Sequence, residues 1–208
     1  MTQRETSGVA WIAGVGAKAG LGAALARRFA RDGYTVAVTA RTAERLAAVV
    51  DDIRKAGGQA HALAADVSRE EDVSALRGRL EQLGPLHATV FNAALAHWAP
   101  TLELSVAQFE ETWRVSTLGG FLVARTALSL LAPQGRGSLI FTGATASLRG
   151  KPPFAAFASA KAGLRSLAQA LAREFGPKGI HVAQRGDRRR HRRRAPAHAQ
   201  PPTRDRRR

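Results

Sequence analysis

Cysteine is absent from this 208-residue sequence, methionine occurs once, and aromatic residues make up only 6% of the chain. The absence of cysteine excludes a disulfide framework, a cysteine-based zinc site and a thiol nucleophile. The apolar stretch near the start, 9–15, is far shorter than the ~20 residues that span a bilayer. We therefore expect a cytoplasmic protein with no metal site and no membrane contact.

Acidic residues are scarce, since 16 Asp and Glu stand against 32 Lys and Arg, for a net charge of +16. Residues 185–208 carry 11 Arg against Asp187 and Asp205, so this short segment holds +9 of that charge. It contains no Leu, Ile, Val, Phe, Trp, Tyr or Met and cannot bury enough surface to fold. We expect a disordered Arg-rich tail. We interpret it as a non-native or truncated end, in preference to a native solvated tail or a nucleic-acid-binding segment.

Before residue 185, short β-branched runs alternate with stretches of helical period. Such alternation is typical of βαβ units that build a parallel sheet. Residues 1–184 are therefore expected to form one α/β domain. Strands are predicted over 9–15, 34–39, 59–65, 86–91, 138–142 and 180–183. Helices are predicted over 21–33, 46–57, 70–83, 109–131 and 154–175.

A glycine-rich loop, residues 14–22, lies between the first strand and the first helix. Glycines there let the chain turn tightly, approach a pyrophosphate closely and pack the helix on the strand, with the anion at the helix N-terminus. The alternative is a glycine-rich turn that binds nothing. Its place after the first strand favours a nucleotide site, with contacts from Gly14, Gly16, Lys18, Gly20, Leu21 and Gly22.

Two further motifs follow in order. Asp66-Val67 comes after the third strand, and Asn92-Ala93-Ala94 comes after the fourth. With the glycine loop, these resemble the TGxxxGxG, adenine-contacting Asp-Val and NNAG motifs of the short-chain dehydrogenase/reductase family, although Val15 stands where that family has Thr. The resemblance covers about 9–183. It implies a three-layer Rossmann fold with a parallel sheet in the order 3-2-1-4-5-6, here lacking the last strand. It also implies a homodimer or homotetramer, paired through the helices 109–131 and 154–175.

The end of the second strand indicates which dinucleotide binds. An acidic residue there would hold both ribose hydroxyls and repel a 2′-phosphate. The sequence has Ala40-Arg41-Thr42 instead, and Arg41 offers a planar fork that suits a phosphate. Lys18 in the glycine loop adds a second positive charge. We therefore predict NADP(H) in preference to NAD(H), the alternative for Arg41 being a solvated arginine at a helix start.

The family's catalytic residues are a Tyr acid/base, a Lys four residues later, a Ser that polarises the carbonyl and an Asn that supports a water relay. The resemblance places these roles at Phe157, Lys161, Ala144 and Ser116, so only the lysine matches. Phenylalanine has no proton to give, and general acid catalysis is worth typically 10²–10⁴-fold in rate. Lys161 is expected to hold the nicotinamide ribose, and reduction of a small carbonyl substrate, or oxidation of the alcohol, is expected to be impaired.

Other side chains are candidates for the missing acid. The hydroxyl of Thr145 lies near the exit of the fifth strand, and His97 follows the Asn92 motif in a loop expected to border the nicotinamide. An ordinary loop histidine is the alternative for His97. Trp98 is a candidate to line a substrate loop. Phenylalanines 109, 154 and 157 are expected to pack in the core.

Three functions stay open at this point. The first is an NADP(H)-dependent oxidoreductase with an altered catalytic site, acting on a carbonyl or alcohol substrate. The second is a nucleotide-binding protein that has lost catalysis. The third is an inactive truncated product.

Overall fold

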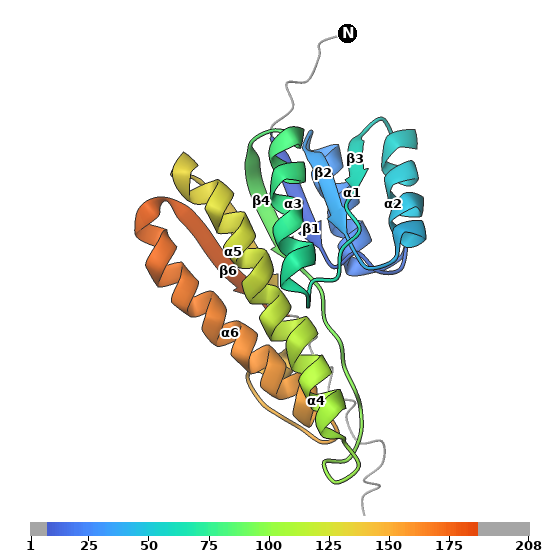
Figure 1. Ribbon diagram of the computed structural model, residues 1–208, viewed down its shortest axis with the longest axis vertical. Coiled ribbons are helices and arrows are strands. Elements are labelled where there is room, and N and C mark those ends of the chain that lie inside the picture. The colour runs from blue at the N-terminus through green and yellow to red at the C-terminus, as the bar shows by residue number, and fades with distance from the viewer. Residues whose placement is uncertain (1–7, 187–208) are drawn as a thin grey trace, which may run out of the picture.

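Six parallel strands form a single sheet in the order β3-β2-β1-β4-β5-β6, as predicted. The computed structural model describes residues 8–186 (Figure 1). The strands are β1 (Val9–Ala13), β2 (Thr35–Thr39), β3 (Gln59–Ala62), β4 (Leu86–Phe91), β5 (Gly137–Thr142) and β6 (Ile180–Arg185). The helices are α1 (Leu21–Arg31), α2 (Ala43–Lys55), α3 (Glu70–Leu83), α4 (Val106–Trp113), α5 (Gly119–Leu131) and α6 (Ala155–Phe175). A π-helix, η1 (Arg114–Leu118), joins α4 to α5, and three short 3₁₀ turns are η2 (Ala132–Gln134), η3 (Thr145–Ser147) and η4 (Gly176–Lys178).

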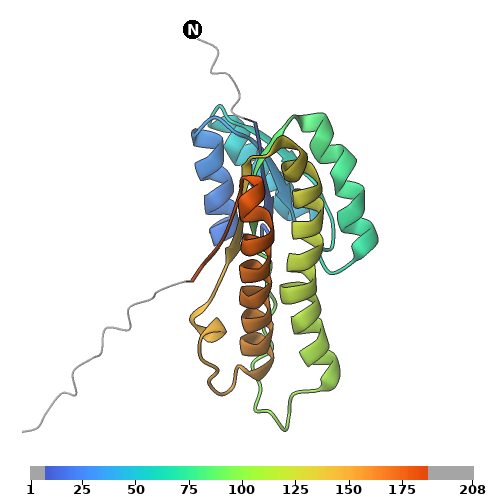
Figure 2. The ribbon, with the colours of Figure 1, turned by 90° about the vertical axis from the view of Figure 1, so that its left-hand side faces the viewer.

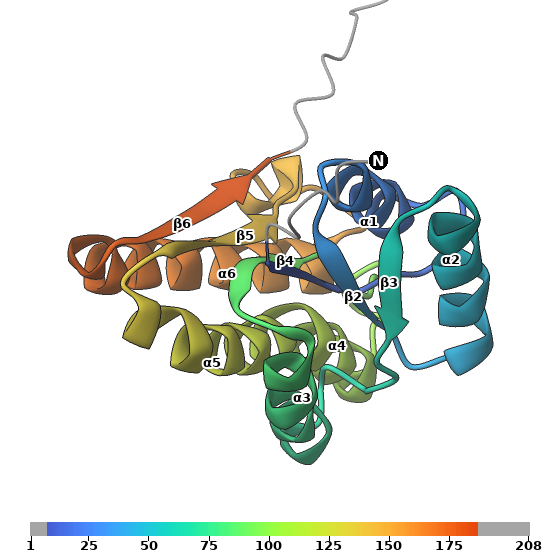
Figure 3. The ribbon, with the colours of Figure 1, turned by 90° about the horizontal axis from the view of Figure 1, so that it is seen from above.

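Helices cover both faces of the sheet, which confirms the Rossmann architecture (Figure 3). The larger core lies between the sheet and α3, α5 and α6, and it includes Trp11, Phe91 and Phe141. The smaller core lies between the sheet and α1 and α2, and it includes Ile12 and Leu46. Strands buried on both faces read as continuous apolar runs, which is why the strand positions are visible in the sequence.

The helical stretch from α4 to η2 is long and apolar enough to cross a membrane by length and composition alone. However, 67% of its most apolar window is buried inside the protein, which is typical of a core helix. Figures 1 and 2 show α4 and the first turns of α6 side by side beyond the carboxyl end of the sheet. The sheet therefore covers only part of each helix.

Several element boundaries differ from the prediction. β1 ends at Ala13 instead of residue 15, because Gly14 turns the chain with a φ of 100°. The helix predicted from residue 109 begins at Val106, where Ser105 and Gln108 form a capping box. It contains the π-helical turn η1, and residues 109–131 are helical throughout, as predicted.

The sixth strand is longer than predicted. Gln184 and Arg185 pair with Phe141 and Thr142 of β5, so the predicted strand end at residue 183 and the assignment of Arg185 to the disordered tail are wrong. Backbone hydrogen bonds to a neighbouring strand do not require an apolar side chain, and apolar patterning therefore missed them. The remainder of the predicted tail, 187–208, lies outside the described residues.

Candidate active site

The glycine loop is the junction at which β1, α1 and β4 meet. A Cβ atom on Gly14 would lie 2.2 Å from the backbone nitrogen of Ala93, and one on Gly22 would lie 2.6 Å from the carbonyl oxygen of Gly14. The Asn92 side chain donates a hydrogen bond to that same oxygen at 2.8 Å. Gly14, Gly22 and Asn92, all predicted at the site, therefore fix the close packing of the glycine loop against the end of β4.

Gly16 and Gly20 face a different environment. A Cβ atom on Gly16 would meet no other atom within 4 Å. Gly20 is the N-cap of α1 and no side chain caps that helix, so the N–H groups of its first turn are left for another acceptor. This part of the loop borders a cavity of about 370 Å³, within the usual size of ligand sites.

The cavity brings together most of the predicted nucleotide-binding residues. They come from the glycine loop, the end of β2, the segment after β3 and the segment after β4. The predicted residues that line it are Gly14, Gly16, Gly20, Leu21, Gly22, Arg41, Asp66, Val67, Asn92, Ala93 and Ala94. A pyrophosphate needs room to approach the backbone and free N–H groups at a helix N-terminus. The open space at Gly16 and the uncapped start of α1 provide both.

Two arginines border the cavity at the start of α2. Arg41 and Arg45 are four residues apart, both are exposed, and neither has an ion-pair partner among residues 8–186. Sequence reasoning missed Arg45, although its spacing from Arg41 across a predicted helix start was a visible signal. Both guanidinium groups are free to pair with an anionic group of a ligand.

Lys18 does not line this cavity. Its Nζ lies 2.8 Å from a carboxylate oxygen of Asp52 on α2. The structure does not place Lys18 beside Arg41 at the cavity, because a carboxylate on the neighbouring helix attracts its ammonium group; its predicted contact with the phosphate stays a prediction. The cationic side of the cavity belongs to the two arginines.

Asp66 is held at the cavity by its own turn. Its carboxylate accepts hydrogen bonds from the backbone nitrogen of Ser68 at 2.9 Å and from the Ser68 hydroxyl at 2.7 Å. Val67 is buried against Gly119 of α5, where a Cβ atom would lie 3.0 Å from the Val67 carbonyl oxygen. The turn is thus anchored on both sides.

Lys161 is buried on α6, with 3% of its surface exposed. Its Nζ donates to the carbonyl oxygen of Thr142 at 3.0 Å and lies 5.9 Å from the centroid of the Phe157 ring. No carboxylate among residues 8–186 pairs with it. Burial lowers the pKa of Lys161 to about 8, because the charged form loses its hydration.

Ser116 lies close to this lysine through the η1 turn. Its hydroxyl accepts a hydrogen bond from the backbone nitrogen of Leu95 at 3.2 Å, and Leu95 lines the cavity. The next residue, Thr117, donates to the carbonyl oxygen of Ala160 at 2.8 Å, directly before Lys161. The structure therefore brings Ser116 to Leu95 at the cavity and joins the η1 turn to the part of α6 that carries Lys161.

Ala144 and Thr145 follow β5, two and three residues after the carbonyl group that Lys161 contacts. The methyl group of Ala144 offers no hydrogen bond, and its carbonyl oxygen accepts from the Ser147 hydroxyl at 2.7 Å. Thr145 opens η3. The position equivalent to the family's serine therefore has no side-chain donor.

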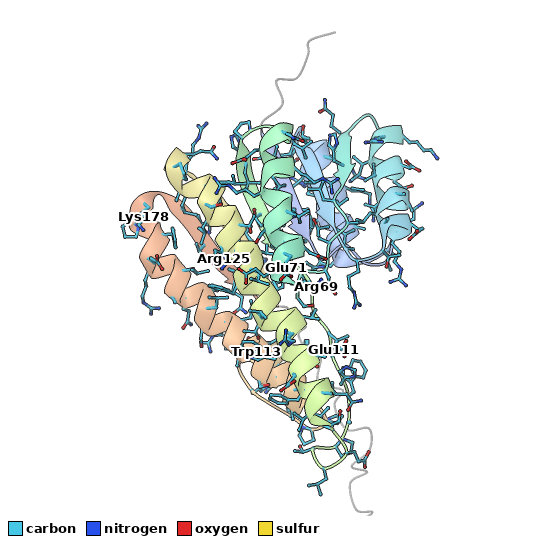
Figure 4. All side chains as sticks on the ribbon, in the orientation of Figure 1. Arg69, Glu71, Glu111, Trp113, Arg125 and Lys178 are labelled. Atoms are coloured by element: carbon cyan, nitrogen blue, oxygen red, sulfur yellow. The ribbon has the colours of Figure 1, made fainter. Side chains whose placement is uncertain are left out.

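His97 is not among the residues that line the cavity. Its Nε2 lies 2.9 Å from a carboxylate oxygen of Glu111 on α4. Figure 4 shows Glu111 and Trp113 on different sides of α4, beyond the sheet. Glu111 orients the imidazole ring toward α4, and the structure does not group His97 with Lys161 through any contact.

The three phenylalanines predicted in the core are not buried. Phe109 is 40% exposed, and Phe154 and Phe157 are half-buried. The core prediction is therefore wrong for all three. The first turns of α4 and α6 extend past the sheet (Figure 2), and none of the three phenylalanines belongs to the apolar clusters on its two faces.

Residues 8–186 contain no cluster of side chains that could bind a metal ion, since no group of three or more His, Asp or Glu side chains is placed to hold one. The arrangement is that of a dinucleotide-binding Rossmann domain, with a cavity lined by the segments that follow β1, β2, β3 and β4.

Comparison with known proteins identifies the class of domain more closely. The family model for short chain dehydrogenases matches residues 10–184. The chain therefore belongs to the short-chain dehydrogenase/reductase family of NAD(P)-dependent oxidoreductases, as the motifs predicted.

Individual relatives agree with this family. The chain is 37% identical over 183 residues to the short-chain dehydrogenase/reductase eriH of Hericium erinaceus, which covers 85% of this chain and 71% of the relative. It is 41% identical to a short-chain dehydrogenase of known structure from Rhodopseudomonas palustris, with a TM-score of 0.82 over 88% of this chain and 85% of that one. A metagenomic short-chain oxidoreductase solved in complex with NADP is 28% identical, with a TM-score of 0.81 over 86% of this chain and 81% of that one.

Proposed function

We propose that this chain is an NADP(H)-dependent oxidoreductase of a carbonyl or alcohol substrate, with an altered catalytic site. One observation carries the choice of cofactor. The cavity has two arginines without ion-pair partners among residues 8–186, Arg41 and Arg45, and its only acidic lining residue, Asp66, is engaged with Ser68. The related metagenomic oxidoreductase holds NADP, which supports the same choice.

The residues present fit a dinucleotide. The glycine loop and the start of α1 would hold the pyrophosphate, Asp66 and Val67 would border the adenine, and Arg41 with Arg45 would hold the 2′-phosphate. Lys161 would hold the nicotinamide ribose. The bound cofactor supplies hydride transfer chemistry at the end of the cavity.

Reduction of a carbonyl group also needs a side chain that donates a proton to the carbonyl oxygen. Phe157 and Ala144 cannot donate one, and Ser116 is bound to the backbone of Leu95. Lys161 and Thr145 lie at this end of the site, and His97 lies on the neighbouring loop. We therefore infer that reduction is slow and uses one of these three groups.

Calorimetric titration with NADPH and NADH tests the cofactor assignment. NADPH should bind roughly tenfold more tightly, since a charge-assisted hydrogen bond contributes about 1.5–3 kcal/mol. Arg41→Ala and Arg45→Ala should each remove most of that preference. Arg136→Ala, an exposed arginine at the opposite end of the sheet, is the control and should leave it unchanged. Equal affinities in the unmodified protein would refute the NADP(H) assignment.

Gly16→Ala tests the pyrophosphate site separately. The added methyl group meets nothing in the free protein, so the melting temperature without cofactor should not change. The increase in melting temperature caused by NADPH should be lost, because the methyl group occupies the space that the phosphates need. An undiminished increase would place the dinucleotide elsewhere.

A second candidate function is nucleotide binding without catalysis. It is favoured by the Phe157 ring, which lies where the resemblance expects the proton donor, 5.9 Å from Lys161. NADPH binding without NADPH consumption across a panel of aldehydes and ketones would support it. Turnover of any of them would exclude it.

We also propose that the protein works as a homodimer or homotetramer. Three exposed apolar side chains, Val106, Phe109 and Trp113, are spaced three and four residues apart along α4. This spacing places them on one stripe of the helix. An exposed apolar stripe beside α6 is a surface that a second copy would cover in an isologous contact.

A further inference from the structure

Three aromatic side chains form a row that ends at Lys161. The rings of Trp98 and Phe154 meet edge to face, with centroids 5.6 Å apart and planes at 75°. Phe154 is the N-cap of α6, and Phe157 and Lys161 follow three and seven residues later on the same helix face. The Phe157 ring lies below the Lys161 ammonium at 5.9 Å. The row therefore runs from an exposed loop to the buried lysine.

The row is not part of either core. Trp98 is 71% exposed, and Phe154 and Phe157 are half-buried. None of the three belongs to the two apolar clusters on the faces of the sheet. The loop before α4 and the loop before α6 both lie beyond the carboxyl end of the sheet (Figure 1, Figure 2). Packing in the two cores therefore does not account for these three rings.

The row is also joined to the cavity. The Lys161 ammonium contacts the carbonyl oxygen of Thr142, and the Thr142 hydroxyl donates to the carbonyl oxygen of Phe91 at 3.3 Å. Phe91 directly precedes Asn92, which lines the cavity. The lysine at the end of the row is therefore linked, through Thr142 and Phe91, to the segment after β4 that lines the cavity.

We propose that this row binds the ring of an aryl aldehyde or aryl ketone, with the carbonyl oxygen directed to Lys161. The proposal deepens the proposed function and depends on it for the reaction, but not for binding. Aromatic pairs contribute about 0.5–1.5 kcal/mol beyond the area they bury, which an aliphatic ring of equal size cannot obtain. An ammonium group has three N–H donors. Thr142 uses one of them and the nicotinamide ribose would use another, so one donor is left for a carbonyl group attached to the ring.

Ligand-detected NMR titrations of the intact protein test binding without relying on turnover. Benzaldehyde and cyclohexanecarbaldehyde are the matched probes, since they differ in the aromatic character of the ring. Benzaldehyde should bind roughly three- to tenfold more tightly. Trp98→Leu and Phe157→Leu keep apolar side chains but remove rings, and each should reduce that ratio toward one.

Phe175→Leu is the matched control, because Phe175 lies at the far end of α6 against Lys178, and it should keep the ratio. Equal affinities of the two probes in the unmodified protein would overturn the proposal. So would a ratio that survives both Trp98→Leu and Phe157→Leu. Trp98 is largely exposed, so Trp98→Leu alters the surface and remains informative even if Phe157→Leu fails to fold.

NADPH consumption then separates this proposal from the proposed function. If benzaldehyde binds preferentially but NADPH is not consumed, the aryl site stands and the oxidoreductase assignment fails. If both aldehydes are reduced with the same kcat/KM, the oxidoreductase assignment stands and the aryl site is refuted. A ratio of kcat/KM that favours benzaldehyde and decreases in Trp98→Leu supports both.

Discussion

Replacing the buried lysine should change how the stability of the protein depends on pH. Lys161 is 3% exposed and has no carboxylate partner among residues 8–186. Burial lowers its pKa from 10.5 to about 8. A difference of that size between the unfolded and folded states corresponds to about 3 kcal/mol.

The sign follows from proton binding. Between pH 8 and 10.5 the unfolded chain holds this proton and the folded chain releases it, so the free energy of unfolding rises with pH. Above pH 10.5 the penalty is absent, and as the pH falls through 8 it reaches its full size. Lys161→Met removes the titrating group, so the unmodified protein should gain up to about 3 kcal/mol relative to this variant between pH 7.5 and 10.5.

Urea unfolding at pH 7.5 and at pH 10.5 measures the free energy of unfolding of the unmodified protein relative to Lys161→Met. The hydrogen bond to Thr142 is lost in Lys161→Met at both pH values, which lowers the stability of this variant by about 1 kcal/mol without producing the predicted rise with pH. Lys55→Met, at an exposed position on α2, is the control. Its difference in free energy of unfolding from the unmodified protein should be the same at the two pH values. If the difference between the unmodified protein and Lys161→Met is constant from pH 7.5 to 10.5, then Lys161 is not buried as a charged group and the reasoning fails.

Three further predictions concern the site, the loop and the assembly. Combining Phe157→Tyr with Ala144→Ser should raise NADPH-dependent carbonyl reduction about 10²-fold, measured by NADPH consumption; a lower rate would show that another acid operates. Gly22→Ala should lower the free energy of unfolding by about 1–3 kcal/mol, measured in urea, because its Cβ would lie 2.6 Å from a backbone oxygen of the glycine loop. Trp113→Asp should convert the proposed dimer to a monomer in light scattering, and an unchanged mass would exclude the α4 stripe from the interface.

Much of the fold could be predicted because its signals are local. The strands read as β-branched runs, and the glycine positions mark the turn after β1. Gly14 and Gly22 are required by contacts within the loop and with the adjacent strand, so their spacing alone identifies the motif. The start of α4 was also readable in principle, since Ser105 and Gln108 have the spacing of a capping box.

The errors at the site arise from contacts between distant parts of the chain. Lys18 and Arg45 are both cationic and both adjoin the nucleotide motifs, but only the folded structure shows that Asp52 engages Lys18 while Arg45 borders the cavity. Likewise, apolar spacing places Phe154 and Phe157 on one helix face without showing whether another element covers it. In the structure both rings are half-buried, and Phe154 meets Trp98 edge to face.

The π-helical turn η1 gives the helical stretch from α4 to α5 one residue more than a regular α-helix of the same length would hold. Each α-helical residue advances by about 100°, and a π turn accommodates the extra residue within one wider turn. Deleting one residue from Arg114–Leu118 would therefore restore a regular turn and leave α4 and α5 nearly in phase. The wider turn is also where Ser116 meets Leu95, with hydroxyl and backbone nitrogen 3.2 Å apart, and that contact would be lost. The extra residue in η1 therefore serves the contact at the cavity, whereas the direction of the exposed stripe on α4 does not depend on it.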